Sequence, residues 1–146
     1  MKSIFNILAS LACALAFTAC GGNDDAPVTT PAPEVVTKVD LAVGTGIEAI
    51  TGDNVTVTYT GWLYDETKTE NKGTQFDQRT AESPYTFPLG KGAVIAGWDQ
   101  GVVGMRQGGK RRLVVPASLG YGATASEKIP ANSKLVFEIE MLAIKR

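Results

Sequence analysis

The chain has 146 residues, of which 44% are hydrophobic and 20% are charged, and its formal net charge is −1. This length fits one compact domain plus a leader, and the nearly balanced charge argues against a nucleic-acid partner. The sequence contains no histidine, which excludes the commonest general base and the commonest metal ligand. Any catalysis must therefore work without an imidazole group.

The first residues have the features of an export signal. Lys2 provides a positive charge, Ile4–Phe17 is an uncharged apolar run, and small residues precede Cys20. The apolar run is shorter than a typical membrane-spanning helix. The four residues ending at Cys20 resemble the lipobox of bacterial lipoproteins, in which the cysteine is lipidated and becomes the new N-terminus. We therefore predict a lipoprotein signal peptide over residues 1–19, with an ordinary cleaved signal peptide as the alternative.

Residues 20–34 are predicted to be the lipid-anchored Cys20 followed by a flexible, proline-rich tether. The segment combines proline with Gly, Asp, Thr and Ala, and such a composition buries too little apolar surface to offset the entropy of ordering. The anchor would place the protein on a membrane of the bacterial cell envelope. Gly21 lacks the aspartate that marks inner-membrane retention in some bacteria, which favours the periplasmic face of the outer membrane if the cell is Gram-negative.

Residues 35–146 have the pattern of an α+β domain. Alternating apolar and polar residues predict strands over Asn54–Thr60, Arg111–Val115 and Leu135–Met141. Helical spacing of apolar residues predicts a short helix near Ala93–Val102. Several antiparallel strands with one helix indicate a sheet with the helix packed on one face.

Five sequence blocks occur in a fixed order in this domain: VTYTGW at 57–62, QFDQR at 75–79, PYTFPLGKGAVIAGWDQGVVGM at 84–105, GYGAT at 120–124 and LVFEIEML at 135–142. Together they resemble the FKBP-type peptidyl-prolyl cis-trans isomerases, the immunophilins that bind tacrolimus and rapamycin. The resemblance covers about Gly52–Arg146. It implies a twisted antiparallel sheet wrapped around one short helix, a proline pocket between them, proline-containing polypeptides as partners, and no cofactor or metal.

The resemblance also implies which residues line the pocket. They are apolar or aromatic, with Trp98 as the floor: Tyr59, Phe76, Tyr85, Phe87, Val94, Ile95, Trp98, Tyr121, Ile129 and Phe137. Any one of them alone is more often a core residue, and Phe87 and Phe137 are the most expected to be partly structural. Their common register with the family blocks favours a pocket.

Trp98, Asp77 and Tyr121 are the predicted catalytic residues. The resemblance implies that the Ile95 N–H and the Tyr121 hydroxyl donate to a substrate carbonyl, and that Asp77 lies beside Tyr59. For Asp77 a purely structural turn is the alternative, and pairing with Arg79 is left open.

The reaction implied by the resemblance is rotation about an Xaa-Pro bond during the folding of exported proteins. No bond breaks, so a dry apolar groove with a few hydrogen bonds is sufficient. Two alternatives are a non-catalytic holdase that uses the same groove and an envelope scaffold lipoprotein with an incidental fold.

Three local features extend these predictions. Leu63–Thr74 is polar and is predicted to be a mobile loop near the pocket rim. Lys128 stands beside Ile129, where relatives place hydrophobic residues over the pocket, so drug affinity is expected to fall. The basic run Lys110–Arg112 is read as the solvated start of a strand.

Overall fold

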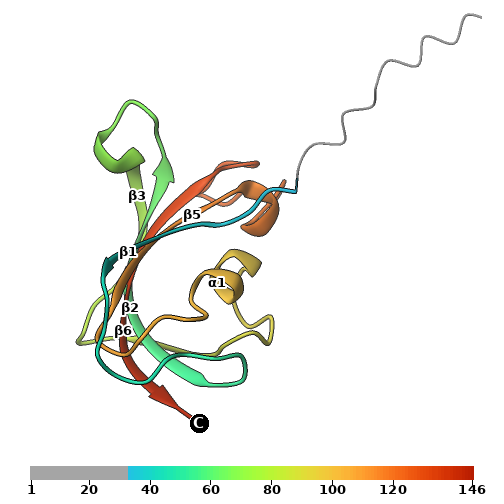
Figure 1. The fold of residues 1–146 in the computed structure, drawn as a ribbon. Coiled ribbons are helices and arrows are strands. Elements are labelled where there is room, and N and C mark those ends of the chain that lie inside the picture. The colour runs from blue at the N-terminus through green and yellow to red at the C-terminus, as the bar shows by residue number, and fades with distance from the viewer. Residues whose placement is uncertain (1–32) are drawn as a thin grey trace, which may run out of the picture. The chain divides into compact units, whose positions relative to one another are not determined.

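Six β-strands and one short α-helix form the domain in this computed structural model, which describes residues 33–146 (Figure 1). The helix is α1 (Ala96–Gly101), and two single 3-10 turns are η1 (Thr69–Asn71) and η2 (Ala117–Leu119). The strands are β1 (Thr37–Ala42), β2 (Asn54–Tyr64), β3 (Lys72–Arg79), β4 (Tyr85–Pro88), β5 (Lys110–Val115) and β6 (Leu135–Lys145).

The strands make one antiparallel sheet in the order β1-β5-β6-β2-β3, with β4 also paired to β2. The long strand β2 has two partners on the same side: its first residues pair with β4 and its later residues pair with β3. The sheet curves around α1 (Figure 1). We call the face toward α1 the inner face and the opposite one the outer face.

The inner face and α1 enclose the hydrophobic core. Leu113 and Val115 of β5 are fully buried there, and α1 turns Gly97 and Gly101 toward them. A Cβ on Gly97 would overlap Val115, and one on Gly101 would overlap Leu113. The two glycines therefore allow the helix backbone to pack directly against the side chains of β5.

The predicted α+β fold is confirmed, with adjustments to the elements. The strand predicted from Asn54 continues to Tyr64, and the strand predicted from Leu135 continues to Lys145. The helix is shorter than the predicted Ala93–Val102, because Ile95 has an extended backbone with φ −57° and ψ 147° and forms the N-cap.

The predicted loop over Leu63–Thr74 is wrong at both ends. β2 includes Leu63 and Tyr64, and β3 begins at Lys72. The Lys72 ammonium lies 4.8 Å from the centroid of the Trp62 ring and 2.6 Å from a carboxylate oxygen of Glu138. These contacts stabilise the β2–β3 hairpin beyond the ends that the polar sequence suggested.

The basic run Lys110–Arg112 begins a strand, β5, as predicted, but it is not a simple solvated run, because all three charges are paired and Arg111 and Arg112 are largely buried. Arg111 is buried on the inner face, where Nε lies 2.5 Å from Asp40 Oδ1 and Nη1 donates to the carbonyl oxygens of Gly101 at 2.8 Å and Val103 at 3.1 Å. Buried charges need this kind of pairing.

On the outer face, Glu138 of β6 is the centre of an ion cluster. Its carboxylate oxygens lie 2.6 Å from Lys72, 2.9 Å from Arg112 and 3.4 Å from Lys110. Glu70 at the hairpin tip contacts both Lys72 and Arg112. The cluster ties the β2–β3 hairpin to β5 and β6.

The predicted signal peptide, Cys20 and most of the predicted tether lie outside the described residues. Within residues 33–146, no helix combines the length and the hydropathy that a membrane span requires.

Candidate functional site

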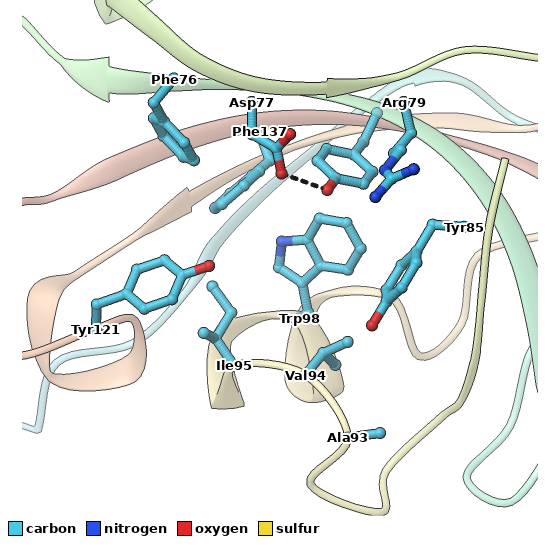
Figure 2. A pocket seen from close by; sticks show the side chains of 11 residues that line it. Phe76, Asp77, Arg79, Tyr85, Ala93, Val94, Ile95, Trp98, Tyr121 and Phe137 are labelled. Carbon is cyan, nitrogen blue, oxygen red and sulfur yellow. Dashed lines mark hydrogen bonds between the residues drawn. The ribbon is translucent and has the colours of Figure 1, made fainter. Parts of the chain in front are cut away.

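A pocket of about 360 Å³ lies between α1 and the inner face of the sheet (Figure 2). Its walls come from β2, β3, β4 and β6, from the segment before α1, and from the turn after η2. The lining residues are Tyr59, Phe76, Asp77, Arg79, Tyr85, Ala93, Val94, Ile95, Trp98, Tyr121 and Phe137.

Trp98 is buried at the base of this pocket, where α1 presents its indole ring to the sheet. The ring makes edge-to-face contacts with Tyr59 at 4.8 Å and with Phe137 at 5.3 Å between centroids. Phe87 and Tyr85 contact it at 5.6 Å and 6.5 Å. Aromatic rings favour such geometry, so the indole plane is fixed from several sides. Among the described residues, Trp98 Nε1 has no hydrogen-bond partner.

A tyrosine–carboxylate pair forms the polar side of the pocket. The Tyr59 hydroxyl donates to Asp77 Oδ2 at 2.6 Å, and the Gln78 N–H donates to Asp77 Oδ1 at 2.8 Å. Burial, and then the hydrogen bond and charge of Asp77, raise the pKa of Tyr59 well above its ordinary value. The Tyr59 hydroxyl therefore remains a donor at neutral pH.

Arg79 also lines the pocket, since its place in β3 is directly opposite Tyr59 in β2. It forms no ion pair with Asp77: in residues 33–146 its guanidinium contacts the Ser83 hydroxyl instead, at 3.4 Å. The sequence raised Arg79 only as a partner for Asp77. Its place in the pocket wall follows from the register between β2 and β3, which could not be predicted from the sequence.

Two hydrogen-bond donors lie at the pocket mouth. Tyr121 is held by the turn after η2, in which Gly122 has φ +56° and its N–H donates to the Ala117 carbonyl at 2.8 Å. Burial, followed by the charges of Asp77 and Tyr85, raises the pKa of the Tyr121 hydroxyl. Ile95 uses its carbonyl to accept from Trp98 at 2.9 Å, whereas its N–H donates to no acceptor among residues 33–146.

Two of the predicted pocket residues lie beside the pocket rather than in its lining. Phe87 is buried behind Trp98 and stacks on Tyr85 with 5.5 Å between centroids. Ile129 lies in an adjoining hollow of about 380 Å³, together with Ser126, Glu127 and Lys128. This second hollow shares Phe76, Asp77 and Tyr121 with the pocket.

The remaining predicted residues line the pocket together, although their chemical roles stay predictions. They are Tyr59, Phe76, Asp77, Tyr85, Val94, Ile95, Trp98, Tyr121 and Phe137. Ala93 also lines the pocket and was not predicted. Only its position next to Val94 could have suggested it.

Comparison with known proteins agrees with this arrangement. Residues 46–142 match the model of the FKBP-type peptidyl-prolyl cis-trans isomerases. The chain belongs to this family. Like its solved FKBP neighbours, it has an antiparallel sheet and one short helix.

FKBP relatives of different lengths match the chain. The FK506-binding protein of Neisseria meningitidis serogroup A is 46% identical over 106 residues, which are 72% of this chain and 92% of that protein. FK506-binding protein 4 of Neurospora crassa is 47% identical over 110 residues, which are 75% of this chain. The match spans only 22% of the length of that longer protein.

Two solved structures have a similar fold. The peptidyl-prolyl cis-trans isomerase from Pseudomonas syringae pv. tomato is similar with a TM-score of 0.64 and 37% identity, over 76% of each chain. AtFKBP13 is similar with a TM-score of 0.64 and 35% identity, over 76% of this chain and 93% of that one.

Proposed function

We propose that this FKBP-family chain is a peptidyl-prolyl cis-trans isomerase that binds Xaa-Pro segments of exported polypeptides in the pocket above Trp98. The observation that carries the proposal is the composition of that pocket: a buried indole floor, aromatic walls, and a few polar groups confined to one side and the mouth.

The chemistry requires a lower rotation barrier and no bond cleavage. Resonance gives the peptide C–N bond a barrier of about 18–20 kcal/mol, and turnover in the ordinary range requires that barrier to fall by about 4–7 kcal/mol. The twisted amide has lost resonance and much of its charge separation. A dry aromatic pocket therefore stabilises it relative to the planar, more polar ground state.

Each polar group has a role in this scheme. The proline ring rests on Trp98, and the Ile95 N–H and the Tyr121 hydroxyl donate hydrogen bonds to substrate carbonyls. Asp77, held by Tyr59 and the Gln78 N–H, supplies a fixed negative charge beside the rotating amide. Asp77 is exposed in the free protein, and its charge acts more strongly once a bound peptide excludes water from the site.

Tacrolimus and rapamycin are proposed to compete for the same pocket. Glu127 and Lys128 line the second hollow next to Ile129. Apolar ligands that cover charged groups leave them poorly solvated, so we expect weaker drug binding than an apolar rim would give.

We further propose that the isomerase is lipid-anchored through Cys20 in the bacterial cell envelope, where exported chains emerge and fold. Support for the anchor comes only from the sequence around Cys20, and it is independent of the pocket.

An isomerisation assay tests the catalytic proposal. The purified protein is mixed with a peptide containing one Xaa-Pro bond, with and without rapamycin, and cis-to-trans relaxation is followed. The proposal predicts acceleration that rapamycin reduces. Binding of the peptide without acceleration would favour the holdase, and neither binding nor acceleration would favour the scaffold lipoprotein.

A further inference from the structure

β1 is an edge strand with an apolar outer face. It pairs with β5 on one side, and within residues 33–146 no strand pairs with its other side. All of its residues are exposed. Val39 is 46% exposed and Leu41 41%, and Val35 and Val43 beyond the strand ends are 72% and 74% exposed. An open apolar edge is a template for pairing with another strand.

The charged residues of β1 point to the other face. Lys38 Nζ donates to the Gln100 carbonyl of α1 at 2.7 Å, and Asp40 pairs with Arg111 on the inner face. Side chains alternate along a strand, so Val39, opposite Arg112, lies on the outer face. Leu41, in the bulge between Asp40 and Ala42, is also exposed. Asp40 remains 46% exposed despite its bond to Arg111.

We propose that β1 pairs antiparallel with β1 of a second copy of this chain, about a two-fold axis at Val39. In this register Lys38 lies opposite Asp40 of the other copy, twice by symmetry, and Thr37 lies opposite Leu41. Val39 meets its own counterpart on the outer face. Opposite charges and apolar groups are thus matched across the axis, and such cross-strand pairs stabilise a sheet.

Charge complementarity selects this axis among its neighbours. An axis at Lys38 would place two lysines opposite each other, and an axis at Asp40 would place two aspartates opposite each other, which destabilises a pair. The regular register of β1 with β5 covers Thr37–Asp40, and the bulge between Asp40 and Ala42 places Leu41 at the end of the segment that can pair with the second copy. The contact joins two sheets into one, and it is isologous, as two-fold interfaces are.

Disulfide cross-linking of the full chain tests the pairing. Residues directly opposite in an antiparallel ladder have Cα atoms about 4.5–5.5 Å apart, which fits the range of a disulfide. Val39→Cys is expected to form a covalent dimer on oxidation at least roughly tenfold more than Ile50→Cys, because pairing raises the local thiol concentration. Ile50 is a matched control, since it is 50% exposed and lies outside the edge strand.

The unmodified chain, which contains Cys13 and Cys20, gives the background in non-reducing electrophoresis. The register is tested with Thr37→Cys and Leu41→Cys: neither alone should exceed that background, and a mixture of the two should. Lys38→Glu, introduced with Val39→Cys, should reduce the cross-linking, because it places a glutamate opposite Asp40 in each of the two symmetric pairs.

Circular dichroism of each variant establishes that it is folded. The proposal is overturned if Val39→Cys cross-links no more than Ile50→Cys, or if the Thr37→Cys and Leu41→Cys mixture stays at background. Because β1 does not line the pocket, the outcome is independent of the isomerase assay.

Discussion

The Tyr59 hydroxyl donates a 2.6 Å hydrogen bond to Oδ2 of Asp77 across the β2–β3 pair. The other carboxylate oxygen of Asp77 accepts the Gln78 N–H at 2.8 Å. With both oxygens engaged, the carboxylate keeps one orientation toward the pocket. The Asp77 charge is therefore preorganised. Its removal should destabilise the transition state more than it weakens substrate binding.

Asp77→Val is expected to lower kcat/KM by about tenfold to a hundredfold, because the negative charge that we propose lies beside the rotating amide is lost. Asp77→Asn, which keeps a hydrogen-bond acceptor for Tyr59, should fall between this variant and the wild type. Tyr121→Phe should cost only about 0.5–1.5 kcal/mol, the net value of a neutral hydrogen bond, and mainly raise KM. Equal losses for Asp77→Val and Tyr121→Phe, measured on one peptide series, would contradict this order.

Trp98→Leu should remove most of the turnover and lower the free energy of unfolding by about 1–3 kcal/mol, because the flat floor is lost and the core changes shape. Phe87→Leu is the control, since Phe87 packs against Trp98 from outside the pocket lining. It should lose comparable stability in urea unfolding and keep most of the activity. Parallel losses of activity in both variants would mean that Trp98 acts through folding alone.

Isomerase activity should be nearly flat between about pH 6 and 8.5, outside the ordinary ranges of carboxylates and tyrosines. The chain has no histidine, and the pKa values of Tyr59 and Tyr121 are both raised, first by burial. Both hydroxyls therefore stay protonated throughout that range. A bell-shaped profile of kcat/KM would show that a titrating group takes part.

Stability should fall as the pH drops from about 4.5 toward 2, because of Glu138. Burial alone would raise the pKa of this carboxyl, but hydrogen bonds from Lys72 and Arg112 and the charges of Lys72 and Lys110 lower it from 4.5 to about 2. The folded-state pKa lies below the unfolded one, so the stabilisation is complete above pH 4.5 and is lost on protonation.

Because the partners of Glu138 are partly exposed, solvent weakens these ion pairs. We therefore expect Glu138 to contribute on the order of 1–2 kcal/mol to the free energy of unfolding. Urea unfolding at several pH values measures it. Glu138→Gln should be less stable than the wild type at neutral pH. Its free energy of unfolding should also change less than that of the wild type between pH 4.5 and 2. Identical pH dependences would remove Glu138 as the cause.

Radiolabelled palmitate should enter the wild-type chain in a bacterial host but not the Cys20→Ala variant. The variant should also be released from membranes without detergent, since the proposed anchor site is gone. Cys13→Ala is the matched control and should label like the wild type. Labelling of Cys20→Ala at the wild-type level would exclude the lipid anchor at this position.

Sequence alternation located the strands that have one buried side. In β2, Val55 and Val57 are fully buried and alternate with threonines, so the period is visible. β1 also alternates, but its charged Lys38 and Asp40 face α1 while its apolar Val39 is exposed, so the rule that apolar residues face the core does not orient this strand. Its inward charge, Asp40, is neutralised by Arg111, a residue far away in the sequence.

The site residues could be predicted where they lie within the family blocks. They could not be predicted where their place depends on the register between strands or on how deeply a side chain is buried. The aromatic lining residues were identified from those blocks. Phe87 lies behind the lining because a block gives the strand but not the depth of each side chain. Ile129 lies outside the five blocks, between η2 and β6, so the blocks do not place it. The place of Arg79 depends on the irregular pairing after Gly61, which only the folded sheet defines.

The direct packing of α1 on β5 has a consequence for substrate fit. Gly97 and Gly101 have no side chain between the helix backbone and β5, and Trp98 is carried by the same helical turn. Because a methyl group at either glycine would overlap Val115 or Leu113, the helix would have to move away from β5, and Trp98 would move with it. Gly97 and Gly101 do not line the pocket, yet the absence of side chains at these two positions fixes the depth of the Trp98 floor.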